Sequence, residues 1–435
     1  MKKHLALIGL ILGYGLLCLK IVPDYLSWET NVFIGLLMLP YVAEIKKGCL
    51  SRRFLVPVLI FSLLAIAVPA RSTLFFMLLF SLLLLFENFI GKLSLAVLFI
   101  LVIISPIFKF FSDTLSFPLR LWLSNLVADT MTFAGMQIKA AGNLISIGKY
   151  EFYIDQACAG LNMLHLSLLI TVFIAAAYQK KRQSPLHFTT IFCLLLITFS
   201  LNIVSNYFRI LMIVIFKIMP GNIFHDLAGL ICMAIYVILP LSLFTGRFIK
   251  YFSRKNQISL VQSTGLTYPY RIITLHITLL LSLGILAFRP KYVREIPAND
   301  KIELAGYKKS IVSRDVIKLE NKTALIYLKP TPFYAPEHNP MICWSGGGYE
   351  FKFIRKVLVK GTEIYMGTLE KGKEKIYAAW WFDNGVLKTT NQWNWRWQSA
   401  IKRESFYLVN VNAVKEEDLL RITEQLLPSP LAGNF

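Results

Sequence analysis

Nine long runs of apolar residues, separated by short polar segments, are the feature that most limits what this chain can fold into. A run of roughly 20 apolar residues crosses the hydrocarbon core of a bilayer as a helix. Only 16% of the residues are charged and 56% are hydrophobic, whereas soluble domains carry roughly 25% charged residues. The sequence therefore predicts an all-α polytopic membrane protein with about nine transmembrane helices. We expect these spans at 4–20, 31–45, 54–69, 72–90, 93–111, 162–178, 187–208, 227–245 and 271–288.

Lysine and arginine gather in alternate connections between these runs, as basic residues do on the cytoplasmic side of a membrane. The dense clusters lie at 2–3, 46–53, 92, 180–182 and 247–255. We therefore expect residues 112–158, 209–226 and everything after 289 to lie outside the cytoplasm. The first run lacks a small-x-small cleavage site, so we expect it to be retained as a span. The same distribution accounts for the net charge of +21, so we expect the lipid bilayer and no nucleic acid among the partners.

The composition changes after Arg289, where charged residues become frequent. Strand-like stretches lie at 323–328, 354–359, 363–369 and 375–382, and a helical pattern follows at 414–427. We expect an extracytoplasmic α+β domain over residues 290–435. Five tryptophans between Trp380 and Trp397 either pack in its core or form a binding surface or a membrane-facing belt.

The long stretch between the fifth and sixth runs is expected to contain no span. Its first part, 119–136, is amphipathic, which is typical of a helix lying in the membrane interface. Its second part alternates apolar and polar residues around Gly142 and Gly148, which predicts a small hairpin.

A cysteine follows that hairpin and directly precedes a membrane span. The positive end of a helix lowers the pKa of a thiol, so Cys158 is a candidate nucleophile. Gly160 would permit the close approach of a backbone or substrate. The alternative is that Cys158 is a small buried residue at a helix start. None of the six cysteines forms a CxxC pair, so we expect no metal and no cofactor.

Two further polar segments are expected at the same depth as Cys158. Counting about 1.5 Å of rise per residue puts Asn206 and Arg209 at the outer end of the seventh span. His225 and Asp226 precede the eighth span at that same end. An arginine here could instead extend to the interface as a snorkelling side chain. A thiolate, an imidazole and a guanidinium at one level permit acyl transfer, with Asp226 in an accessory role.

These segments resemble the exosortase/archaeosortase family, and the exosortase N type in particular. The family marks are a cysteine in an A-C-[SA]-G context, an arginine three residues after an asparagine near the end of a span, and a histidine before the next span. They match Ala157–Gly160, Asn206–Arg209 and His225. The family more often has serine where this chain has Ala159, which removes one possible hydrogen-bond donor.

The resemblance covers about residues 1–250 and implies a cysteine protease or transpeptidase of the bacterial inner membrane. Cys158 would be the nucleophile, Arg209 the stabiliser of the oxyanion and His225 the proton-transfer group, with Asn206, Asp226 and Gly160 accessory. The implied substrates are membrane-anchored proteins that end in a short Pro-Glu-containing motif, an apolar helix and a basic tail. The active site and the C-terminal domain would both be extracytoplasmic.

The C-terminal region resembles the exosortase-associated domain of exopolysaccharide loci. Its pattern is H-x-P-x-x-C-x-x-x-G followed by an aromatic strand, matched by the segments 338–348 and 378–382. His338 and Cys343 could form a second reactive pair or part of a metal site, although two ligands under-fill such a site. The alternative is a turn held by the glycine-rich backbone.

The chain is thus expected to divide into three parts: a catalytic membrane core at 1–250, a basic loop and last span at 251–289, and the outer domain at 290–435. Two other functions stay open. The chain could be a non-catalytic membrane component of exopolysaccharide export or assembly. It could also be a transporter, but it shows no carboxylates in mid-span and no paired broken helices.

Overall fold

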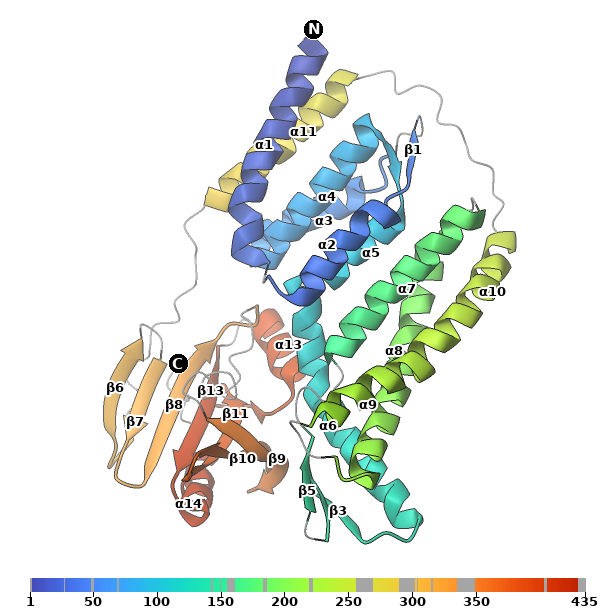
Figure 1. Cartoon of the computed structure of the whole chain (residues 1–435). Helices are drawn as coiled ribbons and strands as arrows, with labels where there is room; N and C mark the ends of the chain where they lie inside the picture. Colours follow the sequence, from blue (N-terminus) through green and yellow to red (C-terminus); the bar gives the residue numbers. More distant parts are fainter. Residues whose placement is uncertain are drawn as a thin grey trace. The chain divides into compact units, whose positions relative to one another are not determined.

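The fold consists of two compact units, which we describe separately in this computed structural model. The first unit contains residues 1–116 and 156–292, and the second contains residues 117–155 and 293–435. Figure 1 shows the helices of the first unit and the sheet of the second. The structure describes residues 2–26, 28–47, 51–68, 70–141, 144–148, 150–154, 161–182, 186–218, 222–255, 269–288, 302, 304–313, 316–334, 349–402 and 405–428.

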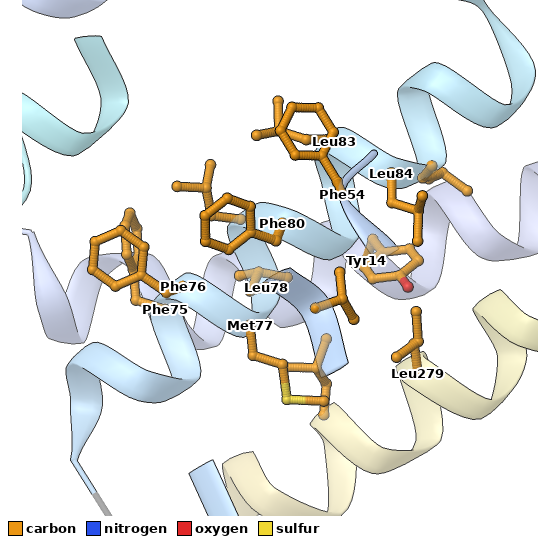
Figure 2. Close-up of a cluster of buried hydrophobic side chains, with 14 of the residues drawn as sticks. Tyr14, Phe54, Phe75, Phe76, Met77, Leu78, Phe80, Leu83, Leu84 and Leu279 are labelled. Atoms are coloured by element: carbon orange, nitrogen blue, oxygen red, sulfur yellow. The ribbon is translucent and has the colours of Figure 1, made fainter. Parts of the chain in front are cut away.

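Four helices of the first unit pack around one apolar core. They are α1 (Lys2–Tyr25), α3 (Leu55–Ala67), α4 (Arg71–Phe89) and α11 (Pro269–Phe288). Phe61 of α3 stacks between Phe76 and Phe80 of α4, with ring centroids 5.2 and 5.3 Å away. Figure 2 shows Tyr14 of α1 and Leu279 of α11 closing this core. α4 is buried on most of its surface, so its apolar run reads continuously rather than on one face.

A buried histidine links three of these helices. Both ring nitrogens of His276 in α11 have partners: the hydroxyl of Tyr14 in α1 at 3.3 Å and the amide nitrogen of Asn88 in α4 at 3.1 Å. All three side chains are buried. Inside a membrane, apolar contact with a helix and apolar contact with lipid are similar in free energy, so hydrogen bonds between helices help to determine which helices pack together.

The remaining helices of the first unit form a second group. They are α2 (Thr30–Val42), α5 (Leu95–Ile103), α7 (Leu161–Arg182), α8 (Phe188–Ile215), α9 (Ile223–Met233) and α10 (Leu239–Lys255). Leu168, Leu169 and Val172 of α7 lie at the centre of their core. α7 and α8 are consecutive and packed side by side (Figure 1).

A π-helical turn, η1 (Ala234–Ile238), joins α9 to α10. Pro240 follows it after one residue, Leu239. A proline in an α-helix removes one backbone donor and clashes with the carbonyl four residues earlier. The wide turn accommodates this, because the N–H of Leu239 reaches back to the carbonyl of Ala234. α9, η1 and α10 thus provide a single apolar helix over Ile223–Phe252.

Among the described residues, five helices are long and apolar enough to cross a membrane. They cover Arg71–Phe89, Met163–Arg182, Phe188–Ile215, Ile223–Phe252 and Tyr270–Phe288. Three shorter apolar helices lie at Leu7–Pro23, Thr30–Val42 and Leu55–Ala67. The mostly helical membrane architecture is confirmed, while the number of nine crossings stays a prediction.

The expected fifth span, 93–111, is wrong in its bounds. Residues Gly91–Leu93 form a short strand, β2, and α5 ends at Ile103. A new helix, α6 (Pro106–Phe133), begins after a bend of 57°. Pro106 explains the break, because proline disfavours helical backbone in the residue before it and suits the first position of a helix. The bent pair would count as a sixth span.

Both sides of α6 mix polar and apolar residues. Ser112, Ser116, Arg120 and Ser124 are buried at intervals of four residues, and Leu123 and Val127 are buried beside them. The exposed residues include Trp122 and Leu126 together with Asn125 and Asp129. The helix expected at 119–136 is present, but it starts earlier and belongs to a longer element.

A three-stranded antiparallel sheet follows α6. Its strands are β3 (Ile138–Ala141), β4 (Leu144–Ile147) and β5 (Tyr150–Tyr153), in that order. Gly148 has a φ of +57° in the turn between β4 and β5, a conformation that glycine adopts at little cost. The expected hairpin is present, with one strand more.

The basic segments of the first unit meet at one end. β1 (Ile45–Lys47) pairs antiparallel with β2, which puts Lys46 opposite Lys92. Lys180 of α7 donates a hydrogen bond to the carbonyl of Tyr41. Gly246 of α10 lies against the ring of Tyr178. This gathering agrees with the charge pattern, and the side of the membrane that this end faces stays a prediction.

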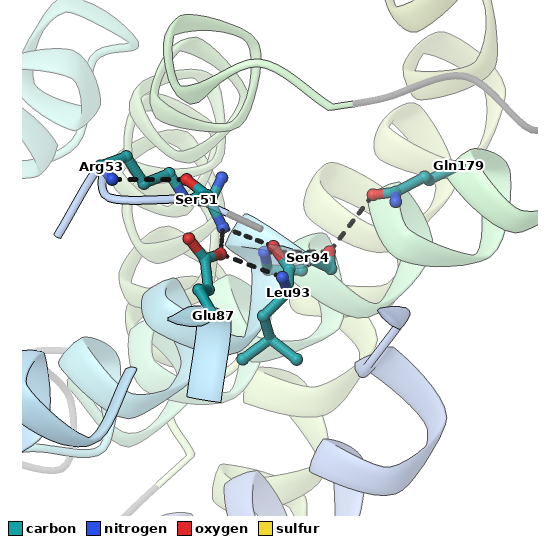
Figure 3. Close-up of polar contacts among 7 residues, drawn as sticks. Ser51, Arg53, Glu87, Leu93, Ser94 and Gln179 are labelled. Atoms are coloured by element: carbon teal, nitrogen blue, oxygen red, sulfur yellow. Dashed lines mark hydrogen bonds and ion pairs between the residues drawn. The ribbon is translucent and has the colours of Figure 1, made fainter. Parts of the chain in front are cut away.

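A polar network lies at this basic end (Figure 3). Glu87 is completely buried and accepts hydrogen bonds from Arg53 and, at 3.0 Å, from the N–H of Leu93. Arg53 also donates to the carbonyl of Leu93. Ser94 then connects to α7 through Gln179, with its Oγ 3.3 Å from the amide oxygen. The network joins the ends of α4, α5 and α7.

The second unit contains an antiparallel sheet in the order β6-β7-β8-β13-β11-β10-β9, with β12 beside β11. The strands are β6 (Lys308–Ser313), β7 (Val316–Glu320), β8 (Ala324–Thr331), β9 (Glu350–Val359), β10 (Thr362–Lys371), β11 (Glu374–Asp383), β12 (Lys388–Thr389) and β13 (Phe406–Ala413). The four strands and the C-terminal helix that the sequence predicts are confirmed.

Helices cover both faces of this sheet. α14 (Glu416–Leu426) packs Leu419 and Ile422 on one face, where Trp381 lies. α13 (Gln392–Lys402) packs Trp395 on the other face, where Trp380 lies. Successive residues of a strand point to opposite faces. This alternation, with both faces covered, explains why all eight residues of β13 are buried.

The buried pair of Arg53 and Glu87 gives a stability prediction. Glu87→Gln removes the buried carboxylate that pairs with Arg53. We expect it to lower the free energy of unfolding by about 3 kcal/mol, because a broken buried pair leaves a charge without compensation. Unfolding in a denaturing detergent series measures the change.

The matched control is Glu29→Gln, which breaks the pair of Glu29 with Lys109, where both side chains are about half exposed. We expect a loss below about 1 kcal/mol there. Equal losses in the two variants would contradict a stabilising role for the buried pair.

Candidate functional site

Hydrogen bonds between α7 and α8 fix how far the two helices slide along each other. The hydroxyls of Thr171 and Thr198 lie 2.8 Å apart. One turn further along, Asn202 donates from its amide to Oγ of Ser167 over 2.6 Å. Moving four residues forward on α8 therefore matches moving four residues back on α7.

Continuing this register one more turn brings Asn206 level with Met163, and Arg209 lies about one turn further toward the start of α7. The chain enters α7 at Leu161, so Arg209 lies at the depth where α7 begins. From the connection between α7 and α8, both points are about 31 Å along the helices. The site is therefore at the end of the first unit opposite the basic segments.

Several of the expected site residues lie outside the described residues. These are Cys158, Gly160, His338 and Cys343. Their roles stay predictions. Among the expected site residues that the structure describes, it brings Asn206, Arg209, His225 and Asp226 to one end of α8 and α9.

Arg209 contacts the first turns of α9. Its Nη2 donates to the backbone carbonyl of His225 over 3.5 Å. The guanidinium also lies over Gly229, where a Cβ would be 3.0 Å from both Cζ and Nε. Arg209 and His225 are both buried. Glycine at this position is thus what allows the guanidinium to lie flat against α9.

Aromatic stacking holds α8 against the helix that follows. Phe208 precedes Arg209 and stacks on Tyr236 of η1, with ring centroids 4.4 Å apart and planes 1° from parallel. Asn222 caps α9 by accepting a hydrogen bond from the N–H of Phe224. These contacts fix the start of α9, and with it His225, relative to α8.

Asp226 approaches the imidazole of its neighbour. Its Oδ1 is 3.6 Å from Nδ1 of His225, while its side chain is 85% exposed. A pair in which one partner is so exposed contributes little to stability. Asp226 can orient the ring, which agrees with the accessory role expected for it.

Asn206 has an unusual environment. Its side chain is only 6% exposed, and neither its amide nitrogen nor its amide oxygen makes a hydrogen bond within the part of the chain that the structure describes. The equivalent side chains one and two turns earlier, Asn202 and Thr198, both bond to α7. A buried amide without partners costs free energy, so its retention suggests a role with a ligand.

Two residues of α9 were not assigned to the site by the sequence. Gly229 and Cys232 follow His225 at spacings of four and seven residues, which puts all three on one helical face. Cys232 is buried with its Sγ 3.7 Å from Sδ of Met212 in α8. The i, i+4, i+7 pattern was visible in the sequence and could have identified this face.

Across the described residues, no three His, Cys, Asp or Glu side chains gather closely enough to hold a metal ion. What the arrangement offers chemically is a buried guanidinium bonded to the backbone carbonyl of His225, whose imidazole is also buried, with the amide of Asn206 one turn away. Such groups can stabilise a developing oxyanion and transfer a proton.

A comparison with family models indicates the class of the membrane segment. The match is to the transmembrane exosortase model, Exosortase_EpsH, and it covers residues 50–242. This segment is similar to transmembrane exosortases. No curated protein and no solved structure matches the chain significantly. The exosortase segment runs from the connection before α3 to the start of α10, and so contains Arg209, His225 and the position of Cys158.

The buried amide of Asn206, which has no partner among the described residues, predicts opposite changes in the free energy of unfolding for two neighbouring asparagines. Asn206→Leu should raise the free energy of unfolding by about 1 kcal/mol, because an apolar group of similar size replaces an unpaired buried amide. Asn202→Leu, one turn away, should lower it by about 1–2 kcal/mol, because Oγ of Ser167 loses its partner. Unfolding of both variants in the same detergent series gives the comparison. A loss of stability in both would show that Asn206 has a structural partner.

The contact between Arg209 and Gly229 gives a second prediction for the exosortase segment. Gly229→Ala should lower the free energy of unfolding by about 1–3 kcal/mol, because the new Cβ forces the guanidinium away. Gly284→Ala in α11 is the matched control, since a Cβ there meets no atom within 4 Å. It should be neutral or stabilise by up to about 1 kcal/mol. A neutral Gly229→Ala variant would mean that Arg209 is not held in place by this contact.

Proposed function

We propose that this chain is a membrane cysteine protease and transpeptidase that cuts the C-terminal sorting signal of exported proteins. In this proposal Cys158 is the nucleophile, His225 transfers the proton and Arg209 stabilises the oxyanion. The observation that carries the proposal is the pairing of buried Arg209 with His225 at the depth where α7 begins. Cys158 precedes Leu161, the first residue of α7, by three positions.

The reaction would begin with attack by the Cys158 thiolate on a peptide carbonyl carbon. An S–C bond forms, the carbonyl electrons move to oxygen, and the oxyanion then collapses and breaks the C–N bond. The imidazolium of His225 gives its proton to the departing amine. The products of this half are a thioester and a released apolar helix.

The second half returns the enzyme to its starting state. An acceptor amine, hydroxyl or water loses a proton to the imidazole of His225 and attacks the thioester carbon. The C–S bond breaks and the thiolate leaves. An amine or hydroxyl acceptor gives transfer of the exported protein, whereas water gives hydrolysis.

Arg209 suits the role of oxyanion stabiliser because its position is fixed before the reaction. The hydrogen bond to the carbonyl of His225 and the contact with Gly229 restrict where the guanidinium can lie. Groups that need no rearrangement as charge develops contribute most to lowering a barrier. The low dielectric constant of a buried site strengthens the interaction further.

Asn206, Asp226 and Gly160 complete the proposal in accessory roles. The free amide of Asn206 can donate to and accept from the peptide backbone of a substrate next to the cleaved bond. Asp226 orients the ring of His225, and Gly160 leaves space for the substrate backbone near the nucleophile.

The membrane setting suits substrates that carry an apolar helix. Such a helix would lie in the bilayer beside the enzyme, with its basic tail at the end where the enzyme's own basic segments gather. The short motif before that helix would then reach the level of Arg209. Because basic residues mark the cytoplasmic side, the proposal puts the site on the extracytoplasmic face of the bacterial inner membrane.

The decisive variant is Cys158→Ala. With purified enzyme in lipid and a reporter protein ending in a motif, an apolar helix and a basic tail, wild type should release the helix and Cys158→Ala should not. Arg209→Lys should slow release by about 10²–10³-fold, since a lost oxyanion donor has that effect. A thioester on wild type that hydroxylamine cleaves would identify the intermediate.

The matched control is Cys193→Ala, which changes another cysteine of the chain near the opposite end of α8. It should cleave at the wild-type rate. Full release by Cys158→Ala would refute the assignment of the nucleophile. If all four proteins failed to cleave and yet supported export equally in cells, the chain would be a non-catalytic component.

A further inference from the structure

α13 is apolar on two opposite faces. Trp395 and Ser399 are buried against the sheet. On the other side, Trp393 is 50% exposed, Trp397 67% and Ile401 61%. We call Trp393, Trp397, Ala400 and Ile401 the outer stripe. Their spacing of i, i+4, i+7 and i+8 puts them on one side of the helix.

The outer stripe is the set of exposed apolar residues that includes two tryptophans on one helical face. Val386 and Val414 stand singly beside turns, and Ile311 and Val312 are neighbours on the edge strand β6. Single apolar residues on a surface need no explanation, whereas a contiguous patch marks an interaction surface. The stripe also answers the question left by the sequence: Trp380, Trp381 and Trp395 form core, and Trp393 and Trp397 do not.

The charged residues of α13 itself, Arg396 and Lys402, are both basic. Arg396 donates to the carbonyl of Phe333, and Lys388, which precedes the helix, pairs with Asp383. Lys402 is exposed at the end of α13. Tryptophan beside lysine and arginine on one helix is typical of a segment in the headgroup region, where anionic lipids attract the basic side chains.

The chain keeps this helix within reach of a membrane. α11, a candidate span, ends at Phe288, and the described chain resumes at Ile302. The thirteen residues between them extend to at most about 50 Å. Within the second unit, Leu121 of α6 packs against the same cluster as Trp395. The next residue of α6, Trp122, is exposed.

We propose that the outer stripe of α13 lies in the headgroup region of the bilayer and binds anionic lipids there. The tryptophans enter the interface, where their rings are apolar and their indole N–H groups stay hydrated. Lys402 contacts the lipid phosphates. α13 thereby attaches the sheet domain to the membrane by a contact separate from the spans.

Quenching by brominated lipid tests this proposal. Full-length protein is placed as single copies in nanodiscs of phosphatidylglycerol with brominated acyl chains, and the quenched fraction of tryptophan emission is measured. Trp28, Trp122, Trp393 and Trp397 are the tryptophans at least half exposed in the described part of the chain. Trp393→Phe/Trp397→Phe should therefore reduce the quenched emission by about half.

Two further variants make the result specific. Trp395→Phe changes a buried tryptophan of the same helix and should leave the quenched emission unchanged. Lys402→Glu should reduce quenching in phosphatidylglycerol discs and not in phosphatidylcholine discs, because only the former are anionic. Unfolding temperatures of all variants establish that the domain stays folded.

The opposite results would overturn the proposal. Unchanged quenching in the double variant would show that the stripe does not contact lipid. If the double variant also lost self-association in detergent, the stripe would instead be an interface with a second copy. Loss of quenching in Trp395→Phe equal to that in the double variant would mean that unfolding, rather than lipid contact, controls the signal.

Discussion

Hydrocarbon offers a polar side chain no water to bond, so polar groups within a helix bundle must bond to one another or be left without partners. The pair α7 and α8 follows this constraint for two turns, through Thr171 with Thr198 and Ser167 with Asn202. The pattern stops at Asn206, whose amide is buried without partners in the described structure. Asn206 is one turn from Arg209, which donates a hydrogen bond to the backbone carbonyl of His225.

The site has firm support around it. Gly229 leaves room for the guanidinium, the stack of Phe208 on Tyr236 holds α8 to η1, and Asn222 caps α9. These contacts hold Arg209 inside the unit, whereas a snorkelling arginine extends toward water. A fixed position of this kind is what the proposed role as oxyanion stabiliser requires.

Apolar runs predicted where most helices of the membrane part lie, because burial in lipid depends on composition over long windows. They did not predict the break before Pro106 or the buried Arg120 of α6, since window averages ignore a single proline and the direction in which side chains point. In the second unit, alternation predicted four strands, while β6, β7, β12 and β13 were missed. Both faces of β13 are buried, so its polar residues Asn410 and Asn412 do not mark a solvent-facing side.

For the candidate site, single polar residues in apolar surroundings led to the prediction of Asn206, Arg209 and His225, which the structure places at one end of α8 and α9. Their partners were not found, because Ser167, Thr171 and Gly229 look ordinary in a sequence and gain meaning only from the helix opposite. The tryptophans of the outer domain show the same limit. Composition grouped five of them, and only the fold separates those in the core from those on the outer stripe.

The wide turn of η1 has a consequence for how the α9 half of its span is oriented. One residue added to a helix rotates everything beyond it by about 100°. The turn therefore changes the direction in which the α9 half faces relative to the α10 half. His225, in the α9 half, lies beside Arg209 of α8, and Gly246, in the α10 half, lies against Tyr178 of α7. The extra residue of the π-helical turn allows one helical span to pack against both neighbours.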